Sequence, residues 1–268
     1  MRIGIAGAGG RMGRMLIKGA GETQGCRVVA GSCLPGEPVA GQDLGIFAGV
    51  QPINIQPSED PEALFQASDV VLDFTAPAAT LAHAKIAARQ NKALMIGTTG
   101  LSAAERAEVA ASAGETAILI ASNTSQGVTL LLSLVERVAA ALDESYDIEV
   151  LEMHHRMKVD APSGTALSLG HAAAAGRGKP LEELWVKSRD GHTGARETGS
   201  IGFATLRGGD VTGEHSVIFA GPGERVEITH KAHSREVFAH GAIRAALWLA
   251  GREPGLYDMT DVLGLKSV

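Results

Sequence analysis

Residues 2–13 read RIGIAGAGGRMG, and this stretch decides the fold. An apolar run of strand length, Arg2–Ala6, passes directly into a cluster of glycines. A strand that ends in a glycine-rich turn and leads into a helix is typical of a dinucleotide-binding fold. The glycines permit a tight turn, and the N–H groups that begin the helix favour a pyrophosphate. The sequence therefore predicts a nucleotide site at the start of the chain.

The glycine spacing departs from the strict pattern G-x-G-x-x-G, because Met12 stands where the last glycine is required. The turn fits G-x-x-G-x-x-G instead, with Gly7, Gly10 and Gly13. A packing turn without a ligand is the alternative, but the flanking strand and helix favour a binding site. The cofactor-binding residues predicted here are Gly7, Ala8, Gly9, Gly10, Arg11, Met12 and Gly13.

Further short apolar runs alternate with alanine-rich stretches of helical character. These runs are Arg27–Ser32, Val70–Thr75, Ala93–Thr98 and Ala117–Ala121. Nearly continuous apolar runs of this length are typical of parallel strands buried on both faces. Ser102 and Glu105 form a capping-box pair that starts one of the intervening helices. Residues 1–125 are therefore predicted to form an N-terminal Rossmann-type domain with a parallel sheet, of the α/β class.

Two loops follow the fourth and fifth predicted strands. Ligands of parallel sheets bind outside the carboxyl ends of the strands, so we expect both loops to border the nicotinamide. The residues concerned are Gly97, Thr98, Thr99, Ala121, Ser122, Asn123 and Thr124. For the second loop, capping of the following helix by Ser125 is an equally good interpretation.

The pattern changes after residue 125. A helix over 126–142 precedes a strand over 147–153, and later strands are predicted over 201–206, 214–220 and 225–231. Glycine-rich turns between the later strands indicate hairpins. We predict a second α+β domain over 126–235, built on a mostly antiparallel sheet. A C-terminal helical segment, 236–268, is expected to complete the first domain.

A dense polar constellation lies in residues 152–166, EMHHRMKVDAPSGTA. Histidine moves protons near neutral pH, and lysine is a cation and a proton donor, so His154, His155 and Lys158 suit acid–base chemistry. Ser163, Gly164 and Thr165 begin a helix, whose free N–H groups form a carboxylate receptor. The group suits an anionic substrate that is protonated during reaction. No metal is expected, because two histidines lack a carboxylate at ligand spacing.

Composition narrows the functional class. The net charge of −6 and the pI near 5.9 argue against nucleic-acid binding through charge. No apolar run approaches the roughly 20 residues of a membrane span, and the N-terminus does not resemble a signal peptide. Cys26 and Cys33 cannot build a disulfide framework. We therefore expect a cytoplasmic protein that binds small molecules.

The choice between NADH and NADPH is less direct. A site selective for NAD usually carries an acid at the end of the second strand, to bind the ribose hydroxyls. Here no acid occurs after that strand until Glu37. With Arg11 and Arg14 near the turn, the sequence favours NADPH and leaves NADH open.

The chain resembles the bacterial dihydrodipicolinate reductases, also called 4-hydroxy-tetrahydrodipicolinate reductases, over essentially its whole length. The most specific match is His154–Ala166, HHRMKVDAPSGTA. The other matching segments are 7–13, 73–75, 97–100, 188–194, 201–204, 213–215, 227–232 and 246–249.

The resemblance implies NAD(P)H-dependent reduction of a cyclic imine dicarboxylate to tetrahydrodipicolinate, in the diaminopimelate route to lysine. It implies that His154 is the acid–base residue and Lys158 the proton donor. It places the substrate carboxylates on His155, Gly164 and Thr165. It also implies a homotetramer assembled through the second domain, and hinges near Ser125 and Arg235.

Departures and alternatives remain. Leu34 and Pro35 occupy the neighbourhood where the family often has an acid, and Thr124 stands where an aromatic residue is common. Arg235 is interpreted as part of a hinge salt bridge in preference to a substrate ligand. The competing functions are a different NAD(P)-dependent dehydrogenase, acting on aspartate or another amino or imino acid, and a dinucleotide sensor without catalysis. Neither needs the His-His-x-x-Lys and Ser-Gly-Thr arrangement.

Overall fold

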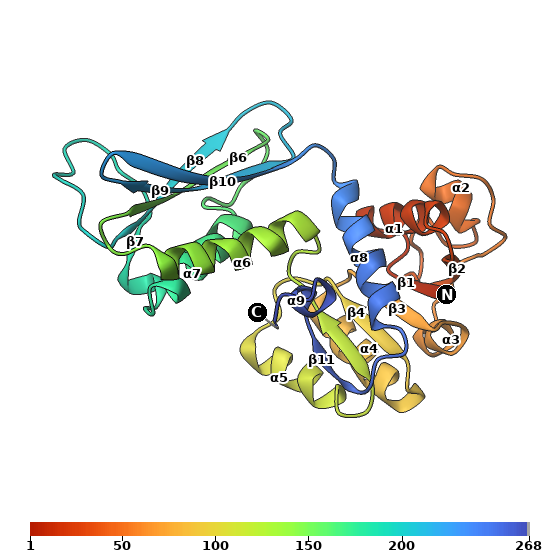
Figure 1. Cartoon of the computed structure of the whole chain (residues 1–268). Helices are drawn as coiled ribbons and strands as arrows, with labels where there is room; N and C mark the ends of the chain where they lie inside the picture. Colours follow the sequence, from red (N-terminus) through yellow and green to blue (C-terminus); the bar gives the residue numbers. More distant parts are fainter. Residues whose placement is uncertain (267–268) are drawn as a thin grey trace. The chain divides into compact units, whose positions relative to one another are not determined.

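The computed structural model describes residues 1–266 and divides into two compact units (Figure 1). Unit 1 comprises residues 1–126 and the segment from 236 onward, and unit 2 comprises residues 127–235. The chain passes between the units after Gln126 and after Arg235. Within residues 1–266, no helix has the length and apolar character of a membrane span.

Unit 1 is built on a parallel sheet with the order β11-β5-β4-β3-β1-β2. Its strands are β1 (Arg2–Ala6), β2 (Arg27–Gly31), β3 (Val70–Asp73), β4 (Ala93–Ile96), β5 (Ala117–Ile120) and β11 (Gly255–Tyr257). The predicted parallel sheet is confirmed. The C-terminal segment is helical over α8 (Glu236–Leu249), as expected, and it also contributes a strand that was not expected, because β11 pairs in parallel with β5 and extends the sheet. A three-residue edge strand carries too little periodicity to be predicted from sequence.

Helices cover the sheet of unit 1 (Figure 1). They are α1 (Arg11–Glu22), α2 (Leu44–Ala48), α3 (Pro61–Ala67), α4 (Pro77–Gln90), α5 (Ala103–Ser112), α8 (Glu236–Leu249) and α9 (Met259–Val262). The capping box at the start of α5 is present in both directions. Helix α8 returns to unit 1, where Ile243 belongs to the same buried core as Leu16 and Leu72.

The third glycine of the turn is fixed by close packing, which leads to a stability prediction. A Cβ atom at position 13 would lie 2.6 Å from the carbonyl oxygens of both Gly7 and Ala8. Backbone atoms cannot move aside cheaply, so Gly13→Ala should lower the free energy of unfolding by roughly 1–3 kcal/mol. Urea unfolding of the purified protein measures this change.

The matched control for that prediction is Gly21→Ala in the same helix. A Cβ atom at position 21 meets nothing within 4 Å. Alanine has the better helix propensity, so this variant should gain roughly 0.5–1 kcal/mol. Equal effects of the two substitutions would contradict the packing argument.

Unit 2 is built on a five-stranded sheet with the order β10-β9-β6-β8-β7. Its strands are β6 (Asp147–His154), β7 (Trp185–Val186), β8 (Ile201–Arg207), β9 (Gly213–Gly221) and β10 (Glu224–Ala232). A short 3-10 helix, η1 (Leu181–Glu183), precedes β7.

The sheet of unit 2 is mixed, which corrects the expectation of a mostly antiparallel one. Strand β9 runs antiparallel to β6 and β10, but β8 runs parallel to both β6 and β7. Between β6 and β8 the chain forms helix α7 (Gly164–Gly176). This helix makes the connection from β6 to the next strand, β7, a crossover, and β7 in turn runs parallel to β8. The sequence predicts a strand over 201–206 but not its direction.

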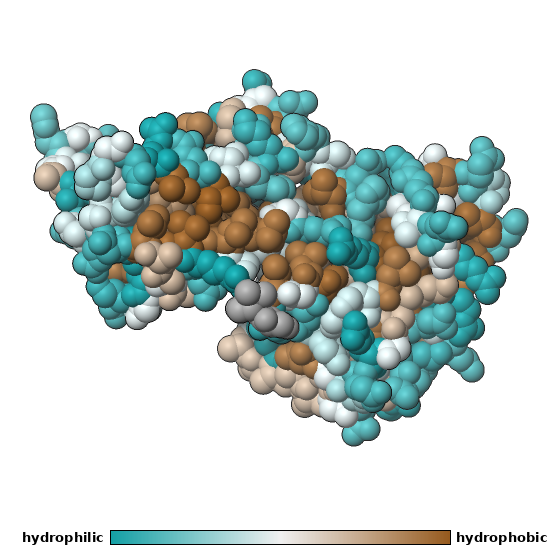
Figure 2. Space-filling model, in the orientation of Figure 1, coloured by the Kyte–Doolittle hydropathy of each residue, from teal (hydrophilic) through white to brown (hydrophobic). Residues whose placement is uncertain are grey.

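Helices α6 (Gln126–Ala141) and α7 cover one face of this sheet (Figure 1). Burial alternates along β6, as expected for a strand with one covered face. Leu206, on β8, leaves 48% of its surface exposed. Apolar atoms also gather on the surface in the region of α6 (Figure 2), where Leu130 and Leu134 are exposed.

Candidate active site

The glycine turn has the geometry that a dinucleotide needs. Gly7 adopts a φ of +65°, and the Gly10 N–H donates to the Gly7 carbonyl at 3.0 Å. Gly10 is the N-cap residue of α1 and has no side chain over the helix start. The close approach of Gly13 to the turn would be blocked by any Cβ atom. The turn therefore presents bare backbone at a helix N-terminus, which fits a pyrophosphate.

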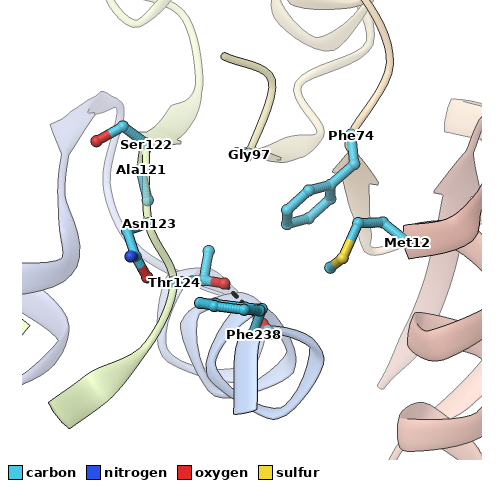
Figure 3. Close-up of a pocket in the computed structure, with 8 residues that line it drawn as sticks. All are labelled: Met12, Phe74, Gly97, Ala121, Ser122, Asn123, Thr124 and Phe238. Atoms are coloured by element: carbon cyan, nitrogen blue, oxygen red, sulfur yellow. Dashed lines mark hydrogen bonds between the residues drawn. The ribbon is translucent and has the colours of Figure 1, made fainter. Parts of the chain in front are cut away.

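A cavity of about 210 Å³ lies in unit 1 beside this turn (Figure 3). Met12 and Phe74 face the segment 121–124 across it, and Phe238 of α8 lies at its base (Figure 3). Its lining residues are Met12, Phe74, Gly97, Ala121, Ser122, Asn123, Thr124 and Phe238. The structure thus brings together predicted cofactor residues from three separate strand ends.

Aromatic surface reaches this cavity from Phe74 and Phe238, neither of which is among the cofactor residues predicted from sequence. Thr124 stands where the resemblance implies that an aromatic residue is common. The Thr124 hydroxyl donates to the Phe238 carbonyl at 2.7 Å, so an aromatic residue from another part of the chain lies beside it. A Cβ atom at position 97 would overlap the ring of Phe74, so glycine there keeps that ring in place. Phe238 is distant in sequence from the other lining residues, which is why no local pattern indicated it.

Two predicted cofactor residues lie differently from the rest. Thr98 is buried, and its hydroxyl bonds to the Thr75 N–H at 3.1 Å and the Thr80 hydroxyl at 2.8 Å. Its side chain therefore supports the loops, while Thr99 is exposed beside it. Asp73, whose side chain bonds to Thr75, is buried and pairs with buried His83 at 2.9 Å.

In unit 2, buried Glu152 is the centre of the polar constellation. The side chain of Glu152 is 1% exposed, and its two carboxylate oxygens accept from Arg207 at 2.8 and 3.0 Å. One of these oxygens lies 2.5 Å from His154 Nδ1, and the other accepts the Ser163 N–H at 3.1 Å. Burial alone would raise the pKa of Glu152, but bonds from Arg207 and His154 lower it overall. The residue is therefore an anion that orients its neighbours.

His154 ends β6 with a defined orientation. Its Nδ1 faces the Glu152 carboxylate, so in the neutral ring Nδ1 carries the proton and Nε2 holds a lone pair. Burial lowers the pKa of His154 below its usual value, and Glu152 offsets part of that shift. The ring is thus poised to accept and return a proton through Nε2.

Ser163 is placed differently from the expectation that it offers a free N–H. Its N–H is already bound by Glu152, and its hydroxyl caps α7 through the Ala166 N–H at 3.2 Å. The hydroxyl also lies 3.2 Å from His215 Nε2, and Ser163 is 2% exposed. Ser163 is therefore occupied as the cap of α7. The first helical residue, Gly164, is exposed, and a Cβ atom there would meet nothing within 4 Å, so a ligand can approach the helix at that point.

Lys158, His155 and Arg235 lie at the more exposed edge of this unit. Lys158 Nζ is 2.8 Å from Asp160, with 21% of its side chain exposed. Arg235 Nη2 lies 3.3 Å from His155 Nε2. Both residues belong to unit 2, and the hinge salt bridge expected for Arg235 stays a prediction. Arg235 is exposed, so its guanidinium beside His155 could also bind an anionic ligand.

His215 provides a test of this buried cluster. Burial, together with the neighbouring His154, lowers the pKa of His215 to about 4. In the unfolded chain His215 has its ordinary pKa of 6.5, so below pH 6.5 the unfolded state binds a proton that the folded state does not. The free energy of unfolding is therefore unaffected by His215 above pH 6.5 and decreases as the pH falls toward 4. Between pH 7 and 5 this group should cost about 2 kcal/mol of unfolding free energy. Urea unfolding at both pH values measures the loss.

The variant His215→Gln should flatten that dependence, because glutamine does not titrate. An unaltered difference between pH 7 and pH 5 in this variant would contradict the assignment. Neighbouring His154, whose pKa is also lowered, accounts for any remaining slope.

Three members of the cluster were missed from sequence as functional residues, namely Glu152, Arg207 and His215. Arg207 contacts Glu152 across 55 residues, and His215 contacts Ser163 across 52. Only the pairing of β6 with β8 and β9 brings them together. The alternation of residues along β6 was the one available signal, since it places Glu152 and His154 on the same face.

Comparisons with known proteins agree with this architecture. Residues 1–124 match the family model "Dihydrodipicolinate reductase, N-terminus", and residues 127–263 match "Dihydrodipicolinate reductase, C-terminus". This chain belongs to the dihydrodipicolinate reductase family. The resemblance drawn from the sequence is therefore confirmed.

Similar members of this family include two 4-hydroxy-tetrahydrodipicolinate reductases. That of Afipia carboxidovorans is 56% identical over 267 residues, covering 100% of this chain and 98% of the relative. One from Mesorhizobium japonicum is 53% identical over 267 residues, covering 99% and 98%. A dipicolinate-bound dihydrodipicolinate reductase from Paenisporosarcina shares the fold, with a TM-score of 0.78, 23% identity and coverage of 97% and 98%.

Proposed function

We propose that this member of the dihydrodipicolinate reductase family reduces 4-hydroxy-tetrahydrodipicolinate to tetrahydrodipicolinate with NADH or NADPH. The reaction belongs to the diaminopimelate route of lysine biosynthesis. The observation that carries the proposal is the buried Glu152–His154 pair beside Lys158 and the open start of α7. A different dehydrogenase or a sensor has no use for this arrangement.

Unit 1 is the proposed dinucleotide-binding domain. The bare glycine turn would hold the pyrophosphate, and the cavity lined by Met12, Phe74 and Asn123 would hold the nicotinamide end. When bound, the reduced cofactor supplies the hydride. Phe74 and Phe238 offer flat apolar surface there, which excludes water from the ring.

Unit 2 is the proposed substrate domain, with catalytic roles for His154 and Lys158. Hydride addition to a conjugated imine builds negative charge that an acid must neutralise. Lys158 carries a proton and a positive charge at the edge of the cluster. His154, held by Glu152 with Nε2 free for proton exchange, serves as the acid–base residue. Glu152 and Arg207 position it without reacting themselves.

The substrate carboxylates are assigned to His155, Gly164 and Thr165, with Arg235 as an addition. The helix start at Gly164 supplies N–H groups and the positive end of the α7 dipole. Arg235 beside His155 supplies a forked donor that matches carboxylate geometry. Ser163 contributes by capping α7 and holding the helix start in place.

We also propose that the enzyme is a cytoplasmic homotetramer assembled through unit 2. Support comes from the sheet face of unit 2 opposite its helices, where Leu206 is exposed among other half-buried apolar side chains. Cys26 and Cys33 are both free thiols, which suits a reducing compartment. Light scattering with size-exclusion chromatography measures the assembly state.

The activity is tested by oxidation of reduced nicotinamide, followed by its absorbance. The substrate is generated in place from pyruvate and aspartate semialdehyde by the upstream synthase. Rapid oxidation that depends on the synthase supports the reductase function. Protein that binds dinucleotide but shows no oxidation with either cofactor would overturn it in favour of a sensor or another dehydrogenase.

A further inference from the structure

A second cavity in unit 1, of about 470 Å³, adjoins the glycine turn and contains two acids. Gly7, Gly10, Ser32 and Cys33 line the side nearest the turn, and Glu37 and Glu59 are its carboxylates. Neither lysine nor arginine is among the residues that line it in the described chain. The cavity lies beyond the end of β2, where the adenosine end of a dinucleotide is bound in this class of fold.

A tight turn brings Glu37 back to this site. Leu34, Pro35, Gly36 and Glu37 form a β-turn, in which the Glu37 N–H donates to the Leu34 carbonyl at 3.2 Å. Gly36 has a φ of +76° and follows a proline, which is the signature of a type II turn. Leu34 and Pro35 stand where an acid is usual after β2. Because they also begin this turn, they bring the carboxylate of Glu37 back toward the end of the strand.

The Glu37 carboxylate lies directly over the glycine turn. A Cβ atom at position 9 would stand 2.9 Å from Glu37 Oε2. That oxygen is shielded from solvent and has no hydrogen-bond partner in the described structure. The pKa of Cys33 is raised by burial and, next, by the negative charges of Glu37 and Glu59. A shielded carboxylate oxygen without a donor is costly, and a ligand hydroxyl relieves that cost.

The two arginines near the turn do not neutralise this charge. The Arg14 guanidinium stacks over the ring of Phe47, 4.2 Å from its centroid. Arg11 is exposed, and neither arginine lines the cavity. A 2′-phosphate would therefore meet carboxylate without a compensating cation.

We propose that Glu37 determines cofactor specificity by accepting hydrogen bonds from the adenosine ribose hydroxyls of NADH and repelling the 2′-phosphate of NADPH. This rests on the proposed function for the identity of the dinucleotide. This proposal reverses the preference for NADPH that the sequence favoured. The position of Glu37 in the sequence did not indicate that the turn brings its carboxylate back to the nucleotide site. Glu37 is a specificity residue that takes no part in the chemical step.

Isothermal titration calorimetry of the intact protein tests the proposal without turnover. We expect NADH to bind at least roughly tenfold more tightly than NADPH. Glu37→Gln keeps the shape but removes the charge, so it should weaken NADH by about tenfold and tighten NADPH. In Glu37→Gln, 5′-AMP should likewise bind more weakly and adenosine 2′,5′-bisphosphate more tightly. Because these fragments lack the nicotinamide, that result would assign the change in affinity to the adenosine ribose.

Glu59→Gln is the matched control, since it removes the other carboxylate of the same cavity. Its ratio of affinities should stay within about twofold of the parent. An equal shift in Glu59→Gln, or an unchanged ratio in Glu37→Gln, would overturn the proposal. Equal binding of NADH and NADPH by the parent also overturns it, while leaving the reductase function intact. Failure to bind either dinucleotide would overturn both.

Discussion

Lys158→Ala should lower turnover by roughly 100- to 10,000-fold, the range that a positioned proton donor contributes. The ammonium group of Lys158 is held 2.8 Å from Asp160, and its charge acts on His154. Alanine supplies neither a proton nor a positive charge to the developing anion. Steady-state oxidation of NADH, with substrate generated in place, measures the loss.

The dissociation constant of NADH should change by less than about twofold in this variant, because the cofactor cavities lie in unit 1. Lys179→Ala is the matched control, since Lys179 is also a lysine of unit 2 paired with an acid, Glu144 at 3.3 Å. It should keep full turnover. A loss of cofactor affinity equal to the loss of turnover in Lys158→Ala would contradict the assigned role.

Glu152→Gln should reduce both stability and turnover. It leaves the Arg207 guanidinium without its charged partner and His154 without its orienting carboxylate. Removing one member of a buried ion pair costs roughly 3–5 kcal/mol of unfolding free energy, and loss of orientation should reduce turnover by about 10- to 100-fold. Urea unfolding and steady-state kinetics measure the two effects.

The pKa of His154 distinguishes orientation from general damage. Glu152 raises that pKa against the effect of burial, so Glu152→Gln should lower it further. Nuclear magnetic resonance titration of the His154 ring measures this shift. Glu149→Gln, on the same strand, is the comparison, because it breaks pairs with Arg189 and Arg196 on the opposite face. A His154 pKa that moves equally in both variants would argue against a positioning role.

Local patterns in the sequence determined most of unit 1. Apolar runs of strand length and the glycine turn predicted β1 to β5 and the helix after β1. Buried parallel strands and capped helices are encoded by neighbouring residues, which explains why these elements were predictable. The stretch over residues 154–166 likewise indicated the family, because its residue types and spacing lie within one segment.

Tertiary structure decided the direction of β8, the addition of β11 and the composition of the polar cluster. It also decided that the Ser163 N–H bonds to Glu152 and that the Ser163 hydroxyl lies beside His215. It likewise placed the Glu37 carboxylate over Gly9. Strand pairing joins residues that are distant in sequence, and a turn can return a side chain to a site that spacing seems to exclude. Periodicity reports which face of an element is buried, but only the folded chain shows which distant groups meet there.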